Sequence, residues 1–330
     1  MPRAFITGIT GQDGSYLAEL LLRKGYEVHG LVRRTSLMQR GRLDAIALSD
    51  EERARRLLLH YGDLGEAGSL ARLVHAIQPD EVYHLGGQSH VRVSFESPES
   101  TFDINASGTL RLLECLREAG RPVRFYHASS CEIYGQATVA PQNEQTRFAP
   151  VSPYACSKAA AHHLTVCYRE SYGLYACNGI LFNHESPRRG ENFVTRKIAL
   201  GAAAAKLHGK KLRLGNLDAR KDWGYAPEYV EAMWLMLRQD APSDYVVATG
   251  EAHSVREFAE AAFAHVGLDW RDWVETDSSQ FRPSETGLLM GDASRAREKL
   301  GWRPKTTFAD LVRLMVDAAM REANAGPRRP

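Results

Sequence analysis

The N-terminal stretch of the sequence restricts the chain to a small number of folds. A short apolar run, "RAFIT", leads into Gly8, Gly11 and Gly14, and an amphipathic run and a second apolar run, "SYLAELLLRKG" and "YEVHGLV", follow. Glycines at this spacing let a strand turn tightly into a helix and let the backbone approach a bound phosphate. A glycine-rich turn without a ligand is the plainer alternative. The strand, helix and second strand around the turn favour a dinucleotide-binding unit.

The same alternation of apolar and amphipathic runs continues along the first half of the chain. "EVYHLGG" and "VRFYHASS" are typical of buried strands, and "TLRLLECLREAG" of the helix between them. This pattern predicts an α/β fold with a doubly wound, Rossmann-like parallel sheet. The second half adds the strand-like runs "ACNGILFN" and "DYVVATG" and three helical runs, near residues 228–238, 254–266 and 307–323.

These runs divide the chain unevenly, and we expect a large domain and a smaller, discontinuous substrate-binding lobe. The predicted division is a Rossmann-like, NADP-binding domain over 1–180 with 211–250 returning to it, a substrate-binding lobe over 181–210 and 251–325, and a tail over 326–330.

Charge and cysteine content narrow the classes of partner. Lys and Arg number 42 and Asp and Glu number 40, so the net charge of +2 gives no electrostatic reason to expect nucleic acid or a membrane as a partner. The five cysteines lack the paired spacing of a metal site, which predicts no metal and suits a reducing compartment. No apolar run is long enough to span a bilayer. We therefore expect a cytoplasmic protein that acts on a small molecule.

The end of the second predicted strand indicates which dinucleotide binds. An acidic residue there would suit the ribose hydroxyls of NAD, but the chain has Arg33 and Arg34, whose guanidinium groups suit the 2′-phosphate of NADP. A solvated surface pair is the alternative. Asp63, at the end of a later strand, could contact the adenine amino group or simply cap the helix that follows.

The segment "SPYACSK" predicts a helix that begins with reactive side chains. Ser152 suits the N-cap and Pro153 the first turn, so Tyr154 and Lys158 fall one turn apart on one face. A phenol titrates near ~10 in water, and we expect the adjacent ammonium and an oxidised nicotinamide to favour the phenolate. Tyrosine and lysine at this spacing are alone more typical of an ordinary helix surface. After a dinucleotide turn, they indicate hydride transfer.

The segment "ASSCEIYG" adds polar side chains where the preceding strand ends. Strand ends on this side of an open α/β sheet border the ligand crevice, so Ser129, Ser130 and Glu132 could join Tyr154 there. A hydroxyl could orient a substrate alcohol. A second carboxylate is more informative, because an enzyme that only moves a hydride does not need one. A surface glutamate is the alternative for Glu132, and a small packed residue is the expectation for Cys131.

Seven separated segments together resemble one family. "ITGITGQDGSYLAE", "VHGLVRR", "QSHV", "FNHESPRRGENFVTRK", "DWGYAPEYVEAMWLML", "VVATGEAHSVREF" and "EKLGWRP" are similar to the GDP-mannose 4,6-dehydratases of the extended short-chain dehydrogenase/reductase superfamily. The resemblance implies internal hydride transfer through NADP. Tyr154, helped by Lys158, would deprotonate the 4-hydroxyl of the sugar, Glu132 would take the proton from carbon 5 and help release the 6-hydroxyl as water, and Ser130 would hold the hydroxyls.

The resemblance also implies binding residues and an assembly. The positions that match the family's cofactor site are Gly8, Ile9, Thr10, Gly11, Gln12, Asp13, Arg33, Arg34, Thr35, Ser36, Asp63, Leu64, Leu85, Gly86, Gly87, Gln88, Ser89, Tyr154, Lys158, His184 and Arg189. The positions implied around the GDP-sugar substrate are Ser89, Glu132, Asn183, Lys197, Gly215, Lys221 and Arg282. The family commonly forms tetramers in which the "RR" loop reaches a neighbour's cofactor, so a homotetramer, or a dimer, is implied.

Several positions depart from the family pattern. Ser130 replaces a threonine and Cys131 a serine, Gly87 replaces an alanine, Lys221 replaces an arginine that contacts phosphate, and Gly287 replaces an acid. The smaller residues suggest a roomier pocket. GDP-mannose is the predicted substrate, and GDP-D-glycero-D-manno-heptose, which carries an extra CH₂OH on carbon 6, is the alternative. A related GDP-sugar reductase or epimerase is a further alternative, and would not need Glu132.

Overall fold

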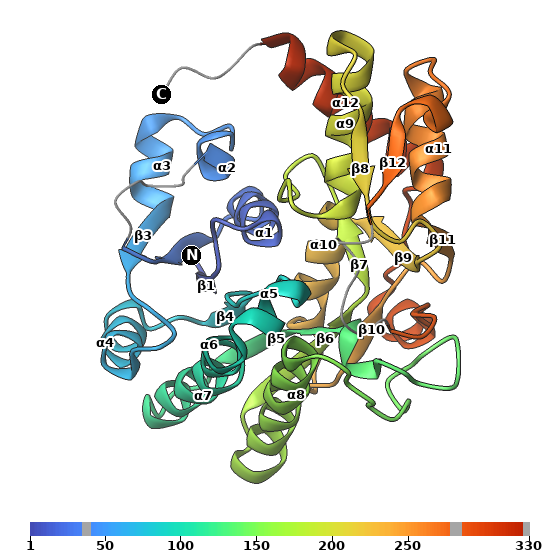
Figure 1. Ribbon diagram of the computed structural model, residues 1–330. Helices are drawn as coiled ribbons and strands as arrows, with labels where there is room; N and C mark the ends of the chain where they lie inside the picture. The colour runs from blue at the N-terminus through green and yellow to red at the C-terminus, as the bar shows by residue number, and fades with distance from the viewer. Residues whose placement is uncertain (35–40, 278–285, 326–330) are drawn as a thin grey trace.

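The structure contains a seven-stranded parallel sheet with helices on both faces (Figure 1). It is a computed structural model that describes residues 1–34, 41–277 and 286–325. The strand order is β10-β6-β5-β4-β1-β2-β3, and every neighbouring pair is parallel. The predicted doubly wound, Rossmann-like sheet is confirmed. Its strands are β1 (Arg3–Thr7), β2 (Glu27–Val32), β3 (Leu57–Tyr61), β4 (Glu81–His84), β5 (Arg124–Ser130), β6 (Tyr175–Leu181) and β10 (Tyr245–Val247).

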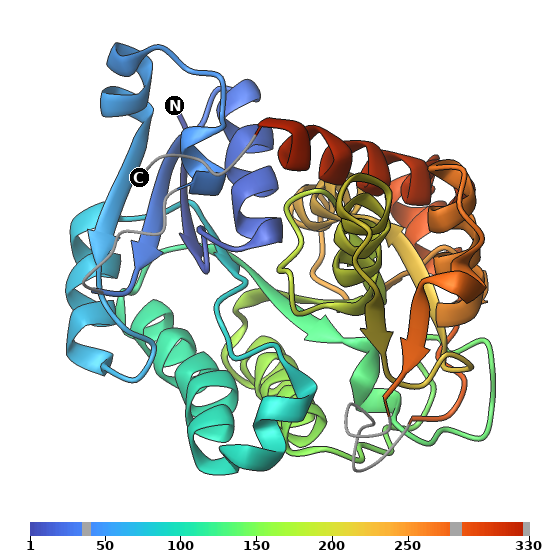
Figure 2. The same ribbon diagram turned by 45° about the horizontal axis from the view of Figure 1, so that its top comes forward.

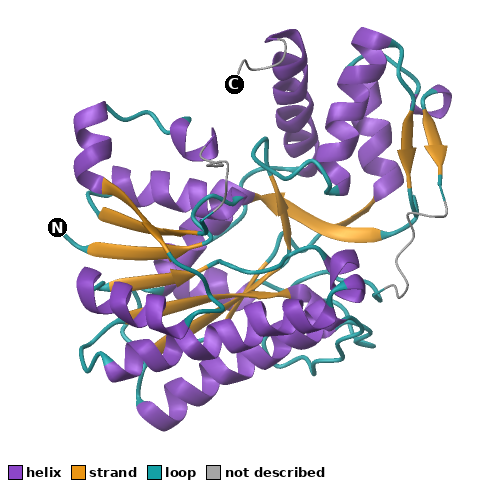
Figure 3. Cartoon of the chain, turned by 60° about the vertical axis from the view of Figure 1, so that its left-hand side comes forward, coloured by secondary structure: helices purple, strands orange, loops and turns teal. Residues whose placement is uncertain are grey.

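The helices cover the two faces of this sheet because side chains alternate along its strands. On β1, Ala4 and Ile6 pack into one core and Phe5 into the other. The first core is covered by α1 (Gln12–Arg23) and α10 (Ala226–Met236), and the second by α4 (Ala67–Ile77), α7 (Gly108–Glu118) and α8 (Pro153–Tyr172). Figure 3 shows the strands between these two helical layers.

Shorter elements connect these layers. They are α2 (Gly41–Asp44), α3 (Asp50–Arg56), α5 (Val91–Glu96), α6 (Pro98–Phe102), a π-helical turn (Asp103–Ser107) and a 3₁₀ turn, η2 (Cys131–Tyr134). Within residues 1–34, 41–277 and 286–325, no helix is both long enough and apolar enough to cross a membrane.

The smaller lobe has two small sheets and three helices. The sheets are β11-β9-β7, from β7 (Asn183–Glu185), β9 (Arg220–Tyr225) and β11 (Ala252–Ser254), and β12-β8, from β8 (Leu212–Leu214) and β12 (Val274–Thr276). The helices are α9 (Val194–His208), α11 (Val255–His265) and α12 (Phe308–Ala325), with a 3₁₀ turn at Trp270–Asp272. A π-helical turn at Ala296–Leu300 packs instead in the core beside α1 and α10. Figure 2 shows α12 lying beside α9 and α11, with which it shares an apolar core.

The predicted helices of the second half are present as α10, α11 and α12. Within the predicted return segment 211–250, α10 and β10 pack on the seven-stranded sheet, whereas β8 pairs with β12 and packs in the core of the smaller lobe. The predicted tail, 326–330, lies outside the described residues. The domain boundaries themselves stay a prediction.

Candidate active site

The glycine turn lies between β1 and α1, as the sequence predicts, and its geometry requires glycine. Gly8 has a φ of +73°, and a Cβ on it would lie 2.8 Å from the backbone nitrogen of Gly86. A Cβ on Gly14 would lie 2.3 Å from the carbonyl oxygen of Gly8. No side chain larger than hydrogen fits either position, so the backbone of the turn stays open to a ligand at the start of α1.

A partly buried ion pair ties this turn to the smaller lobe. Asp13, in the first turn of α1, lies 2.8 Å from Nε2 of His184 on β7, and the other ring nitrogen of His184 lies 2.7 Å from the carbonyl oxygen of Phe182. Burial alone would lower the pKa of His184, but the Asp13 carboxylate and these hydrogen bonds raise it above its ordinary value. Because both ring nitrogens face acceptors, the ring is an imidazolium that donates from both.

The four predicted catalytic residues line one cavity of about 390 Å³ between the large sheet and the smaller lobe. Ser130 ends β5, Glu132 follows in η2, and Tyr154 and Lys158 come from α8. Ser152 caps α8 by accepting a hydrogen bond from the Ala155 amide at 3.1 Å, which confirms the predicted helix start. The predicted spacing therefore brings the tyrosine, lysine, serine and glutamate into one buried site.

The electrostatics of Tyr154 differ from the prediction in one respect. Burial raises the pKa of Tyr154 above its ordinary value, while a hydrogen bond with Ser130 and the charge of Arg189 lower it. Lys158 is not among these causes, because its ammonium donates to the carbonyl oxygen of Ala128 at 2.8 Å, and burial lowers the pKa of Lys158 to about 8. Within the chain, Ser130 and Arg189 rather than Lys158 act to lower the pKa of Tyr154, and they do not offset the effect of burial.

Glu132 is buried beside a cation from the smaller lobe. Its side chain is 7% exposed, and Oε1 lies 3.7 Å from Nζ of Lys221 on β9. Lys221 also donates a hydrogen bond to Oγ1 of Thr286 at 2.8 Å. The sequence predicted both residues for the site but not their pairing, because the pair joins segments far apart in the chain.

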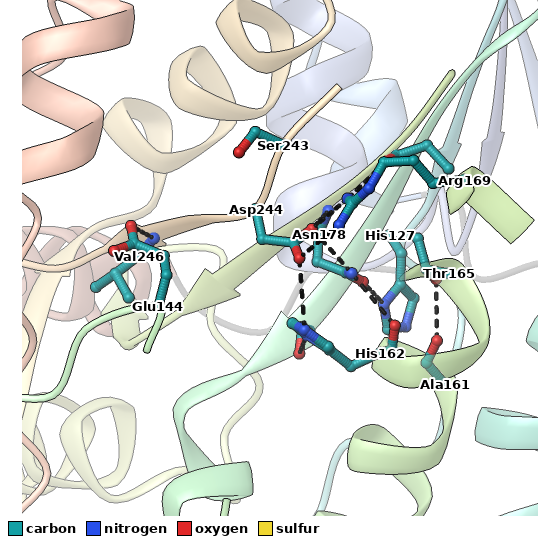
Figure 4. A network of polar contacts seen from close by, with 12 residues as sticks. His127, Glu144, Ala161, His162, Thr165, Arg169, Asn178, Ser243, Asp244 and Val246 are labelled. Atoms are coloured by element: carbon teal, nitrogen blue, oxygen red, sulfur yellow. Dashed lines mark hydrogen bonds and ion pairs between the residues drawn. The ribbon is translucent and has the colours of Figure 1, made fainter. Parts of the chain in front are cut away.

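A second polar network supports the strand end that carries Ser130, and the sequence analysis did not predict it. Asp244 accepts hydrogen bonds from Arg169 and Asn178 and lies 3.7 Å from Nε2 of His162 (Figure 4). Nδ1 of His162 lies 3.2 Å from Oγ of Ser129, which lines the cavity.

The protonation of His162 follows from its surroundings. Burial lowers its pKa to about 4, so the ring is neutral near pH 7. The Asp244 carboxylate favours the tautomer with its N–H at Nε2, and Nδ1 then accepts from the Ser129 hydroxyl. The sequence does carry a signal for this residue, since Tyr154, Lys158 and His162 recur every four residues along α8.

Arg33 and Arg34 line a separate, more open pocket. It lies where β2 and β3 end, and Asp63 and Arg72 line it as well. Neither predicted arginine makes a hydrogen bond or ion pair with a residue in the described part of the chain, and both are exposed. Asp63 accepts from the Gly65 amide at 2.8 Å, and the N-cap position of the following helix is Glu66, whose side chain makes no capping hydrogen bond. The helix-cap alternative for Asp63 is therefore wrong.

The remaining predicted residues fall into three groups. Besides the catalytic four, the cavity is lined by Asp13, Leu85, Gly87, Gln88, Ser89, Asn183, His184, Arg189, Lys197, Gly215 and Lys221. The structure places Gly8, Ile9, Thr10, Gly11, Gln12, Leu64 and Gly86 outside the lining of both pockets, and the side chains of Ile9 and Leu64 are buried in the cores. Thr35, Ser36 and Arg282 lie outside the described residues.

The positions that suggested a roomier pocket do not all open it. A Cβ on Gly87 would lie 2.7 Å from Oδ1 of Asn105, so the missing methyl makes room for Asn105. Gly287 packs against the backbone of residues 135–137 and does not line the cavity. Only Ser130 among these smaller residues presents its changed side chain to the cavity.

Comparison with known proteins identifies the family. The model of the GDP-mannose 4,6 dehydratase family matches residues 5–315. GDP-mannose 4,6 dehydratase 1 of Arabidopsis thaliana is 59% identical over 95% of this chain and 88% of its own length. The chain belongs to the GDP-mannose 4,6-dehydratase family.

Two solved structures with this fold were determined with a nicotinamide dinucleotide. The dTDP-glucose 4,6-dehydratase DesIV of Streptomyces venezuelae, solved with NAD, has a TM-score of 0.84 and 26% identity, and the match covers 98% of each chain. RMD of Pseudomonas aeruginosa, complexed with NADPH, has a TM-score of 0.77 and 26% identity, covering 98% of this chain and all of the other. The comparisons support a nicotinamide cofactor for this member of the family.

Proposed function

We propose that this protein converts GDP-mannose to GDP-4-keto-6-deoxymannose by internal hydride transfer and loss of water. The single observation that carries the proposal is the burial of Glu132 in the cavity that also holds Tyr154. Oxidation at carbon 4 needs one proton acceptor, and elimination across carbons 5 and 6 needs another. A buried carboxylate next to a phenol supplies both. Family membership supports GDP-mannose as the substrate.

The residues around the glycine turn fit a nicotinamide dinucleotide, and we propose NADP. The turn excludes side chains where a pyrophosphate would approach, and Arg33 and Arg34 offer guanidinium groups for a 2′-phosphate. When bound, the dinucleotide would accept the hydride from carbon 4 and return it to carbon 6, with a proton taken up at carbon 5, so that the reaction is redox-neutral.

Tyr154, Ser130 and Lys158 would serve the oxidation. Tyr154 would take the proton of the 4-hydroxyl, and Ser130, which lines the same cavity, would orient that hydroxyl. Lys158 would contribute positive charge near the phenolate, although its ammonium is held by Ala128 in this structure.

Glu132 would serve the elimination. The ketone at carbon 4 acidifies the C–H bond at carbon 5, and Glu132 would accept that proton. The electron pair of the broken bond forms the carbon 5–carbon 6 double bond as the 6-hydroxyl leaves, protonated by Glu132, as water. One carboxyl group can perform both transfers, because it is ionised for the first and protonated for the second.

The smaller lobe would bind the nucleotide of the substrate. Asn183, Lys197, Gly215 and Lys221 line its side of the cavity, and burial lowers the pKa of Lys197. Arg282 is proposed for the same role by resemblance. The homotetramer and the cytoplasmic location stay predictions from the sequence.

One assay tests the proposed function. Purified protein with GDP-mannose and catalytic NADP⁺ is expected to yield a product that mass spectrometry shows to have lost one water, without net use of NADPH. Net consumption of NADPH would indicate a reductase instead. A product of unchanged mass would indicate an epimerase, and no product with GDP-mannose would contradict the assignment of the sugar.

A further inference from the structure

Lys221 occupies a position between the two halves of the active site. It lies on β9 of the smaller lobe and is 9% exposed, whereas Glu132 lies in η2, directly after β5 of the large sheet. Nζ of Lys221 is 3.7 Å from Oε1 of Glu132 and donates to Oγ1 of Thr286. The ammonium is therefore held against the carboxylate that the proposed mechanism uses for elimination.

The resemblance assigns Lys221 only a contact with the substrate's phosphate. The observed geometry gives it a second partner within the chain, and that partner is buried. Moving a carboxylate out of water is costly unless a cation and hydrogen bonds compensate it. An ammonium at this distance also favours the ionised carboxylate over the neutral acid. The base that takes the carbon 5 proton must be ionised at that moment, so the pairing acts on the elimination step.

We propose that Lys221 is a positioning residue for Glu132, holding the carboxylate ionised and aimed into the cavity for removal of the carbon 5 proton. The inference rests on the proposed function, because it presumes that Glu132 is the base. The oxidation, which Tyr154 and Ser130 serve in the proposed mechanism, does not require the Lys221 ammonium. Loss of the Lys221 ammonium is thus expected to slow elimination while hydride transfer continues.

The test is Lys221→Met, which keeps a long side chain and removes the charge. In a single turnover with GDP-mannose, the near-ultraviolet absorbance of the reduced cofactor reports hydride transfer, and mass spectrometry of the quenched mixture reports loss of water. We expect dehydration to fall roughly tenfold or more, with hydride transfer within about twofold of wild type. Reduced cofactor and an undehydrated 4-keto sugar should therefore accumulate in the variant.

Three further variants separate the charge from the fold. Lys221→Arg keeps a cation and is expected to restore most of the dehydration rate. Thr286→Val keeps the ammonium but removes the hydroxyl that holds it, so a smaller effect in the same direction is expected. Arg220→Met is the matched control, because Arg220 precedes Lys221 on β9 but pairs at the surface with Glu257. It should leave both steps unchanged.

Other results would overturn the inference. If Lys221→Met raises KM without accumulating reduced cofactor, Lys221 contacts only the substrate's diphosphate. If the variant slows hydride transfer and dehydration equally, its role is structural. If Lys221→Met does not fold, the other two variants decide. The proposal would be contradicted if Thr286→Val dehydrates the substrate at the wild-type rate and Lys221→Arg does not dehydrate it. Failure of the wild type itself to dehydrate GDP-mannose would instead contradict the proposed function.

Discussion

The cavity that holds Glu132 and the pocket that holds Arg33 differ in how their charged side chains are paired. In the cavity between the large sheet and the smaller lobe, Glu132 lies beside Lys221, and the Lys158 ammonium donates to the carbonyl oxygen of Ala128. In the open pocket, Arg33 and Arg34 are exposed and have no polar partner among the described residues. The protein thus preorganises the reacting groups, whereas the guanidinium groups of the two arginines are available to pair with an anionic ligand. Preorganisation suits catalysis, and unpaired cations suit recognition of an anion.

The largest effect is expected at Glu132, in the preorganised cavity. Glu132→Gln should reduce dehydration on the order of a hundredfold or more, because the amide cannot accept the carbon 5 proton. Some hydride transfer should remain, since oxidation precedes elimination. Tyr154→Phe is the matched comparison and should abolish both steps. In a single turnover, the absorbance of the reduced cofactor measures hydride transfer and mass spectrometry measures loss of water. Dehydration by Glu132→Gln at nearly the wild-type rate would show that another group is the base.

The next effect concerns the partly buried pair that joins the glycine turn to the smaller lobe. His184→Phe keeps a ring against Tyr229 but leaves the Asp13 carboxylate without its cation, so the free energy of unfolding should fall by about 3 kcal/mol. His265→Phe, which removes an exposed pair with Asp317, should cost far less. Denaturant titration measures both, and equal losses would contradict the account.

The same pair predicts how stability depends on pH. The pKa of His184 is raised on folding, so its contribution is present below about 6.5 and is lost as the pH rises through the raised pKa. Burial raises the pKa of Asp13, but His184, Gln12 and Arg189 together lower it on balance, so the contribution of Asp13 is lost only as the pH falls through that lowered pKa. His184→Phe should flatten the loss of stability on the alkaline side.

A smaller effect is expected from the open pocket. Replacing both Arg33 and Arg34 with alanine should weaken NADP binding at least roughly tenfold and leave NAD binding nearly unchanged, because a charge-assisted hydrogen bond contributes about 1.5–3 kcal/mol. Calorimetry on cofactor-free protein gives both affinities, with Arg313→Ala as an exposed control far from the pocket. Equal wild-type affinities for NADP and NAD would contradict this division of roles.

The smallest effect is expected from the network behind Ser129. His162→Phe removes the acceptor of the Ser129 hydroxyl and should lower kcat/KM several-fold, on the order of 1 kcal/mol. If the histidine acts through that hydroxyl, Ser129→Ala and the double variant should show the same loss rather than the sum. Additive losses in the kinetic double-mutant cycle would show that His162 does not act through Ser129.

The parts of the molecule that were predictable from sequence depend on local geometry. The glycine turn follows from a steric requirement at Gly8 and Gly14, and the start of α8 from Ser152 and Pro153. Alternating apolar runs were enough to predict the parallel sheet, because each strand and helix has its own period. These features can be predicted without knowing which other segments pack against them.

The unpredicted parts depend on tertiary contacts between distant segments. Lys221 meets Glu132 only because β9 of the smaller lobe lies across the end of β5, and Asp244 meets His162 only because the loop before β10 reaches α8. The electrostatics of Tyr154 also required the structure, since Lys158 bonds to a backbone carbonyl that the helical spacing does not reveal.

The most direct test of the account follows one hydride through the reaction. GDP-mannose with deuterium on carbon 4 is incubated with the enzyme and catalytic NADP⁺, and the product is examined by mass spectrometry and NMR. If one site performs oxidation, elimination and return of the same hydride, the product will have lost water and will carry the deuterium on carbon 6. A dehydrated product without deuterium on carbon 6, or deuterium recovered in free NADPH, would contradict the central claim.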